Sequence, residues 1–513
     1  MPPKSQPTAI PFRLYTASFL CGAMVMVLEM TGSRVLAPYL GTSLIVWTSL
    51  IGIVLASLSF GYWYGGIVAD KHPEPKLLAK IIFAAAIFIA IVGFSYPFVL
   101  KSLTAGRTSL YTLAIVSSTV LFAVPGALLG MVSPFVVRLA VQDIRSTGTT
   151  VGRLYALSSI GSILGTFLGG FILIAFFKTG TILFGIAVVL VFVALFVQGK
   201  APKSPNFVIG LLSIFGFLAG GLWMGVYGDK FLPPGEHRDT PYNHIRVYET
   251  GNRYLRNLQT DPGSTCQSFM FIDNPNALAS RYCEYNELAF HFHPDLKNML
   301  VVGGGGYCLP KHILIKREGV NVDVVEIDPG ITKVAREFFG LTDEMLNDPR
   351  LSIFHEDARR FLRRMKSEIE AGSRAKYDFL FGDAFNSHYN IPFHLTTKEY
   401  MEEVSACLSD DGIFMTNIIS SINGEKSGLF QGFHRALTEV FPQVEVFMVS
   451  DTKNDKDIQN IVLVGFKTPL EMKTNAETPQ RISFLLDHRK KITVPKTIPP
   501  LTDAFAPVEW YVL

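Results

Sequence analysis

The chain has 513 residues, of which 49% are hydrophobic and only 17% are charged, against the ~25% charged residues usual in soluble domains. Its formal net charge of +3 gives no sign of the basic surface typical of proteins that bind nucleic acids. The five cysteines show no Cys-x-x-Cys spacing, so we expect neither a disulfide framework nor a zinc site.

Long apolar runs are concentrated in the first half of the chain. Seven of them are long enough to cross ~30 Å of hydrocarbon, which takes about 20 residues each. We predict spans near 14–33, 44–69, 77–99, 109–137, 152–177, 180–198 and 206–227. The first run is too long for a cleaved signal peptide, and no small-x-small site follows it. The sequence therefore predicts a multi-pass α-helical membrane domain over residues 1–228.

Lys and Arg are unevenly distributed between the loops. Seven spans place the two ends of the chain on opposite sides of the membrane. The loops 70–76, 138–151 and 199–205 and their flanks hold eight Lys and Arg, and the other loops hold four. We expect a protein of the cell inner membrane with a cytoplasmic C-terminal domain. The last span separates loop 199–205 from that domain, so the positive-inside rule does not itself support this orientation.

Two features within the spans favour structural roles. Gly161, Gly165 and Gly169 recur every four residues in the fifth span, a spacing that lets helices approach closely in lipid. Glu29 and Arg34 bracket the end of the first predicted span. An ionisable group at membrane depth is a functional candidate, but near an interface mutual pairing or snorkelling is the simpler explanation.

After the spans, residues 229–240 contain Pro233, Pro234 and Gly235 and indicate a linker. Short alternating segments then predict a small β-hairpin region over 241–298. From residue 299 to 513, strands and helices alternate, which predicts a Rossmann-like parallel sheet with helices on both faces. We expect strands near 299–302, 322–327, 351–354, 377–382, 411–418, 443–449 and 460–466. Helices are expected near 309–317, 330–339, 357–370, 397–408 and 426–440.

Residues 299–306, Met-Leu-Val-Val-Gly-Gly-Gly-Gly, begin a nucleotide-binding pattern. Glycines in such a turn let the backbone approach a ligand that any Cβ would block. The next strand ends on Glu326, about twenty residues later, and this carboxylate can accept from both ribose hydroxyls. Asp357 and Asp383 follow later strands. Taken alone, Asp357 could be a helix N-cap and Asp383 a charged residue at the end of a strand. Following Glu326 at successive strand ends, they indicate a ligand site.

Residues 241–420 resemble the spermidine synthase family, the polyamine aminopropyltransferases. The matching pieces are Pro241-Tyr242-Asn243-His244-Ile245, Glu284-Tyr285-Asn286-Glu287, Val302-Gly303-Gly304-Gly305, Val325-Glu326-Ile327-Asp328, Asp348-Pro349-Arg350, Glu356-Asp357-Ala358 and Tyr377-Asp378. With seven spans ahead of these motifs, the whole chain resembles the membrane-fused branch of the family. The resemblance implies a class I methyltransferase-type fold for the soluble part.

The resemblance also implies a donor substrate and a role for each matched residue. The donor is S-adenosylmethionine or its decarboxylated form, with no metal. Asp383 takes the proton from the attacking amine. The residues implied in donor binding are Gly303, Gly304, Gly305 and Gly306 beneath the amino-acid or aminopropyl arm, Glu326 at the ribose, Asp357 with Ala358 at the adenine, and Gln267 on the nucleoside side. Tyr285 is implied on the amine side.

The chain departs from the family at the polyamine end. The family grips the aminopropyl ammonium with an aspartate where this chain has Gly306, and Asn386 replaces the second aspartate of its Asp-x-x-Asp motif. Each lost ion contact is worth roughly 1.5–3 kcal/mol. Asn386, His388 and His394, in the loop after Asp383, remain candidates for contacts to the acceptor.

Three functions follow as expectations. The first is a membrane-anchored transferase that moves an aminopropyl group to an amine. The second is a methyltransferase acting on a small or membrane-associated substrate, because a neutral Gly306 suits a donor that keeps its carboxylate. The third is a nucleoside sensor or transporter without turnover, against which Asp383 argues because binding alone needs no proton acceptor. Expected partners are a small amine or membrane-associated acceptor and the lipid bilayer, with a homodimer as a further alternative.

Overall fold

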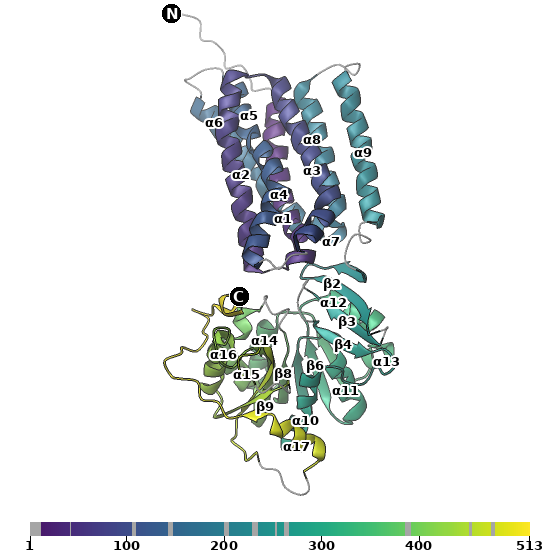
Figure 1. Cartoon of the computed structure of the whole chain (residues 1–513), viewed down its shortest axis with the longest axis vertical. Coiled ribbons are helices and arrows are strands. Elements are labelled where there is room, and N and C mark those ends of the chain that lie inside the picture. The colour runs from purple at the N-terminus through teal and green to yellow at the C-terminus, as the bar shows by residue number, and fades with distance from the viewer. Residues whose placement is uncertain are drawn as a thin grey trace, which may run out of the picture. The chain divides into compact units, whose positions relative to one another are not determined.

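The computed structural model describes residues 12–41, 43–104, 109–141, 147–199, 205–227, 234–251, 254–260, 266–384, 391–450, 454–472 and 478–512. The chain divides into two compact units, Met1–Pro234 and Gly235–Leu513 (Figure 1). Each unit has hydrophobic core clusters of its own.

In the described part of the first unit, helices are the only regular secondary structure. Its helices are α1 (Phe12–Leu40), α2 (Leu44–Lys71), α3 (Pro75–Thr104), α4 (Leu110–Gly130), α5 (Val132–Ala140), α6 (Thr147–Phe167), a π-helical turn η2 (Leu168–Leu173), α7 (Ile174–Phe176), α8 (Thr179–Gln198) and α9 (Pro205–Tyr227). Among the described residues, seven helical segments are long and apolar enough to cross a membrane, as predicted. Two are composite: α4 with α5, and α6 through α7.

One expectation about the first span is wrong. Helix α1 continues to Leu40, so Glu29 and Arg34 lie within the helix and do not mark its end. The side chain of Glu29 is buried against the other helices. The sequence was misleading because Glu29, Arg34 and the polar residues between them interrupt the apolar run without interrupting the helix.

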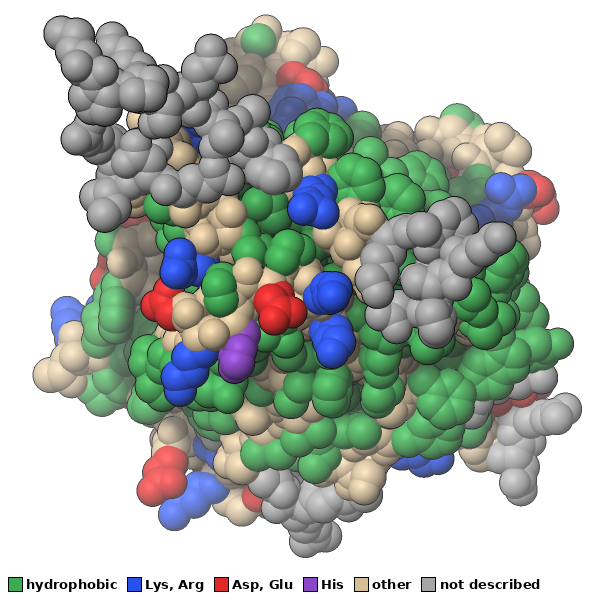
Figure 2. Space-filling view, turned by 90° about the horizontal axis from the view of Figure 1, so that it is seen from above, with side chains coloured by type: hydrophobic (Ala, Val, Ile, Leu, Met, Phe, Trp, Pro, Cys, Tyr) green, Lys and Arg blue, Asp and Glu red, His purple; other side chains and the backbone are tan. Residues whose placement is uncertain are grey.

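The glycine spacing in the fifth span serves close packing. A Cβ added to Gly161 would lie 2.1 Å from the carbonyl oxygen of Phe19, and one added to Gly165 would lie 2.3 Å from that of Ala23. Helix α6 therefore contacts the backbone of α1 directly. Hydrophobic side chains, shown in green, dominate the face seen in Figure 2, where charged side chains form only small groups. Exposed apolar side chains on α6 and η2 include Ile163, Leu164, Phe167 and Phe171.

The second unit begins with a four-stranded antiparallel sheet in the order β1-β2-β3-β4. The strands are β1 (Glu236–Asp239), β2 (His244–Thr250), β3 (Leu255–Gln259) and β4 (Ser268–Phe271). Strands β2 to β4 lie where the hairpin region was predicted. Strand β1 falls inside the predicted linker 229–240, where it pairs with β2 from Glu236↔Val247 to Asp239↔His244. The linker prediction is therefore wrong for these residues.

The main sheet has eight strands in the order β12-β10-β11-β9-β8-β5-β6-β7. The strands are β5 (Asn298–Val302), β6 (Asn321–Val325), β7 (Leu351–Phe354), β8 (Tyr377–Gly382), β9 (Leu408–Ser420), β10 (Gln443–Met448), β11 (Gln459–Phe466) and β12 (Arg489–Lys490). Strands β9, β8, β5, β6 and β7 are parallel, as predicted. Strands β11, β10 and β12 are antiparallel, so the sheet is mixed.

Helices cover both faces of the main sheet, as predicted. Along β5, Met299 and Val301 join one core cluster while Leu300 and Val302 join the other, which is the alternation expected of a strand buried on both sides. The first cluster also includes residues of α10 (Asn286–Phe292), α11 (Cys308–Lys316), α12 (Pro329–Phe338) and α17 (Gln480–Asp487). The second includes residues of α14 (Ala358–Glu370), α15 (Lys398–Cys407), α16 (Gly428–Thr438) and α18 (Val508–Val512).

Candidate nucleoside site

A cleft lies where β5, β6 and β8 end. Its walls include the glycine turn after β5, Glu326 after β6, Asp357 after β7 and Asp383 after β8, together with residues of the first sheet. Strand β5 lies between β6 and β8, so the chain reverses its direction of winding here. Ligands of open α/β sheets bind at this point, beyond the carboxyl ends of the strands.

The glycine turn forms one wall of the cleft. Gly303 has φ 95° and Gly305 has φ 48°, which L side chains rarely adopt. A Cβ on Gly303 would lie 2.3 Å from the carbonyl oxygen of Asp383. The structure therefore brings Gly303, Gly304 and Gly305 to the cleft, as the sequence suggested.

Gly306 departs from the expectation. It does not line the cleft, and its N–H donates to Ser268 Oγ at 2.8 Å. An added Cβ would lie 2.9 Å from the ring of Phe339. The expectation that Gly306 passes beneath the donor arm is therefore wrong. The following residue, Tyr307, takes φ 54°, which directs the chain away from the cleft and into α11.

Glu326 is held firmly at the end of β6. One of its oxygens, Oε2, accepts from the N–H of Gly304 at 2.8 Å, and Oε1 accepts from the N–H of Asp328 at 2.9 Å. Burial raises the pKa of the Glu326 carboxyl, and the two backbone N–H groups oppose this rise. Each oxygen keeps a lone pair, so the group can still accept from two ribose hydroxyls.

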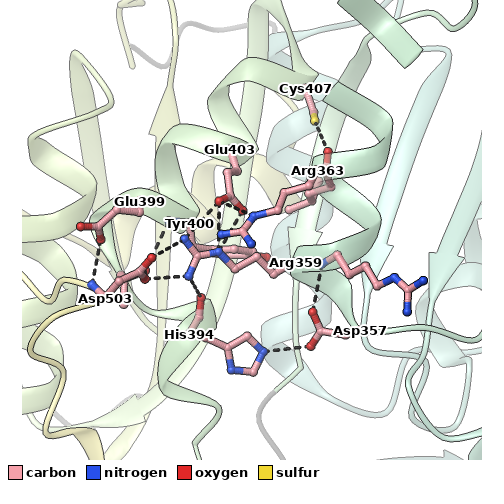
Figure 3. A network of polar contacts seen from close by, with 12 residues as sticks. Asp357, Arg359, Arg363, His394, Glu399, Tyr400, Glu403, Cys407 and Asp503 are labelled. Carbon is pink, nitrogen blue, oxygen red and sulfur yellow. Dashed lines mark hydrogen bonds and ion pairs between the residues drawn. The ribbon is translucent and has the colours of Figure 1, made fainter. Parts of the chain in front are cut away.

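Asp357 acts as a helix cap and lines the cleft at the same time. Its Oδ1 accepts from the N–H of Arg360 at 2.9 Å, which caps α14, and its Oδ2 lies 2.9 Å from His394 Nε2 (Figure 3). The hydrogen bond to His394 lowers the pKa of the Asp357 carboxyl. Ala358 and His394 also line the cleft. His394 thus lies in the cleft beside the residue predicted to bind adenine, and its expected contact with the acceptor stays a prediction.

Asp383 follows β8 and is half-buried. Its Oδ2 accepts from the Tyr282 hydroxyl at 2.8 Å, and the side chain of Asn417 makes a further hydrogen bond. Burial raises the pKa of Asp383 to about 6, while these two hydrogen bonds act in the opposite direction. A carboxylate of this kind is ionised at neutral pH and accepts a proton more readily than an exposed aspartate.

Tyr282 and Asn417 were missed in the sequence. Tyr282 lies in the 3₁₀ turn η4 (Arg281–Tyr285), at the other end of which stands the predicted substrate residue Tyr285. Tyr285 is buried, its hydroxyl donates to Met448 O at 3.3 Å, and its ring packs against Phe447. Tyr285 therefore does not line the cleft as predicted, whereas Tyr282 does, together with Tyr242.

The remaining predicted positions divide into two groups. Gln267, just before β4, lines the cleft as expected. Asn386 and His388 lie outside the described residues. Within the described part of the chain no cluster of three or more His, Cys, Asp or Glu side chains has the arrangement of a metal site.

The charges around the cleft have one sign. Among the described residues, the lining contains the acids Glu326, Glu356, Asp357 and Asp383 and one histidine, His394, but neither Lys nor Arg. Such a lining favours ligands that carry positive charge.

Comparison with known proteins agrees with this geometry. Residues 285–451 match the spermine/spermidine synthase domain family. The matched residues all lie in the second unit. Over 167 residues the chain is 32% identical to a polyamine aminopropyltransferase of Lachnospira eligens, covering 32% of this chain and 55% of that protein. It is 32% identical over 182 residues to one of Vibrio vulnificus, covering 35% and 57% respectively.

The synthase domain match includes Glu326, Asp357, Asp383 and His394 but neither Gln267 nor the seven apolar helices. The chain spans about half the length of the curated relatives it matches. Among solved structures, a probable spermidine synthase from Corynebacterium glutamicum is similar with a TM-score of 0.42 and 16% identity, over 54% of this chain and 98% of that one.

Proposed function

We propose that the synthase domain transfers an aminopropyl group from decarboxylated S-adenosylmethionine to an amine. The observation that carries the proposal is the charge of the cleft, where four carboxylates and no Lys or Arg line the described walls. Both proposed reactants are cations, the donor through its sulfonium and its terminal ammonium and the acceptor through its ammonium. Curated relatives named polyamine aminopropyltransferases support the same reaction.

In this proposal the protein has two chemical tasks. Asp383 accepts a proton from the acceptor ammonium, which frees the nitrogen lone pair. That nitrogen attacks the aminopropyl carbon bonded to sulfur, the C–S bond breaks, and its electron pair remains on sulfur as neutral methylthioadenosine leaves. A positive sulfur needs no further activation, so the second task is to align the two reactants. Glu326 and Asp357 would fix the nucleoside for this purpose.

The arm of the donor separates aminopropyl transfer from methyl transfer. S-adenosylmethionine carries a carboxylate on its arm, and an uncompensated charge next to Asp383 would be unfavourable. The described lining offers no cationic side chain to pair with it. In the sequence, the neutral Gly306 was an argument for methyl transfer. Gly306 does not line the cleft, so it no longer supports that reaction. The decarboxylated donor therefore fits better.

Product analysis tests the proposal. The full chain, purified in detergent, is incubated with either donor and a panel of mono-, di- and triamines, and products are identified by mass spectrometry. We expect methylthioadenosine and an aminopropylated amine from the decarboxylated donor. S-adenosylhomocysteine would instead establish methyl transfer, and tight nucleoside binding without either product would favour a sensor.

We further propose that the seven apolar helices anchor the protein in the cell inner membrane with the synthase domain in the cytoplasm. Their length and composition support the anchor. The loops richer in Lys and Arg are separated from the synthase domain by an odd number of spans, so the positive-inside rule does not support the orientation, which rests on measurement. An acceptor that is associated with the membrane would be concentrated near such an enzyme.

A further inference from the structure

The loop that carries His394 lies over the predicted adenine end of the cleft. His394 belongs to the 3₁₀ turn η5 (Phe393–Leu395) and, with Pro392 and Leu395, lines the cleft. Its ring holds Oδ2 of Asp357, whose Oδ1 is held by the start of α14. The Asp357 carboxylate is thus fixed from two sides. These two contacts set the direction in which its remaining lone pairs point.

The backbone of His394 is held in turn by Arg359. The guanidinium of Arg359 donates through Nη1 to the carbonyl oxygen of His394 at 3.4 Å (Figure 3). This side chain is only 8% exposed, and it follows directly after the cleft residue Ala358 on α14. A buried guanidinium requires charged partners, because leaving it unpaired is strongly unfavourable.

Two carboxylates supply that pairing, and one of them comes from far along the chain. Glu403 on α15 contacts Arg359 Nε at 3.0 Å. Asp503, 144 residues after Arg359, pairs with it in a bidentate fashion, with Nη1–Oδ1 2.6 Å and Nη2–Oδ2 2.7 Å. Paired charge-assisted bonds of this type fix orientation as well as adding energy.

The segment around Asp503 is itself anchored beside the His394 loop. Oδ1 of Asp503 also accepts from Thr397 Oγ1 at 2.7 Å, and its N–H donates to Glu399 Oε2 at 3.0 Å. The N–H of Lys398 donates to Leu501 O at 2.8 Å. The segment Leu501–Asp503 therefore connects the start of α15, the end of the His394 loop and the guanidinium behind the cleft.

We propose that Leu501–Asp503 and Arg359 form a positioning element for the nucleoside site, which holds His394 and Asp357 so that the site distinguishes adenine from other purines. This inference rests on the proposed function, in which the donor is an adenosine derivative. Asp503 and Arg359 act as positioning residues, since they do not line the cleft. An ionised Asp357 accepts from the 6-amino group of adenine but repels a 6-carbonyl oxygen, so its exact placement sets the discrimination.

The test compares binding of 5′-methylthioadenosine and 5′-methylthioinosine to the full chain in detergent by calorimetry. We expect the unaltered protein to prefer the adenosine by at least about tenfold, and Asp503→Asn and His394→Ala to reduce this preference to about threefold or less. His394→Gln keeps a donor for Asp357 and should restore most of the preference. Asp343→Asn, which removes an exposed ion pair with Arg336, is the matched control and should leave the preference for the adenosine unchanged.

Each outcome decides a separate point. If Asp503→Asn lowers the unfolding temperature but keeps both affinities and their ratio, its role is only structural and the inference is overturned. If Asp503→Asn does not fold, Glu399→Ala removes the acceptor for the Asp503 N–H and should reduce the ratio in the same direction, and an unchanged ratio overturns the inference. If the unaltered protein binds neither nucleoside, the proposed function fails as well. If every variant keeps the preference of the unaltered protein for the adenosine, the inference is refuted but the proposed function is not.

Discussion

The environment of Asp383 combines two opposing influences on one carboxyl. Burial raises its pKa, and hydrogen bonds from Tyr282 and Asn417 restrain that rise. The result, about 6, lies between the pKa of an ordinary aspartate and neutral pH. The group is therefore charged under working conditions while retaining more basicity than an exposed carboxylate.

This environment predicts a pH profile. Transfer requires ionised Asp383, so kcat/KM should fall as the pH falls below about 6, with the acidic limb set by this group. Asp383→Asn should lower kcat by roughly 10²–10⁴-fold while leaving affinity for methylthioadenosine nearly unchanged. Steady-state rates between pH 5 and 9, with calorimetric binding in parallel, measure both effects. A variant that retains full activity would exclude Asp383 as the base.

Tyr282→Phe is an informative companion variant. The Tyr282 hydroxyl donates to the charged form of Asp383, and removing it raises the pKa of the carboxyl. The acidic limb should then move to higher pH, while activity on the alkaline side is largely kept. A limb that stays in place would show that a different group titrates.

The sequence located the acidic residues but not their neighbours. Glu326, Asp357 and Asp383 each follow a predicted parallel strand, and strand order alone brings such ends together. Tyr282 reaches the site from a 3₁₀ turn and His394 from a loop, and neither segment has a periodic pattern that predicts side-chain directions. For this reason Tyr285 was chosen in place of Tyr282.

At the level of elements, strands with strong apolar runs were predicted closely. The predicted and observed ranges are the same for β7 (351–354) and β8 (377–382). The short helices α10, α13 (Asp343–Leu346) and α17 were missed, because segments of this length carry little periodicity. The antiparallel placement of β10 and β11 also escaped prediction, since pairing direction depends on topology more than on residue pattern.

Helix α6 offers a direct test of packing in the first unit. Gly161→Leu places a side chain against the Phe19 carbonyl, where even a Cβ would lie at 2.1 Å, so α1 and α6 must separate. We expect a loss of roughly 1–3 kcal/mol or more, seen as a lower unfolding temperature in detergent. Gly152→Leu on the same helix is the control, because nothing lies within 4 Å of its added Cβ. Equal destabilisation by both variants would show that close packing at Gly161 is unimportant.

For the molecule as a whole, the seven apolar helices lead to a prediction of topology. Green fluorescent protein fused after Leu513 should fluoresce, and alkaline phosphatase at the same position should be inactive, if the synthase domain is cytoplasmic as proposed. Fusions after Gly199, which one span separates from the synthase domain, should show the reverse. Active phosphatase at the C-terminal position would reverse the proposed orientation.

The distance in sequence between Arg359 and Asp503 has a consequence for biosynthesis. A ribosome must translate 144 residues past the guanidinium before its bidentate partner exists. Until then, Arg359 has Glu403 as its carboxylate partner, and the N–H of Lys398 at the start of α15 lacks its acceptor, Leu501 O. A nascent chain should therefore acquire the adenine selectivity proposed above only after residue 503 has been translated.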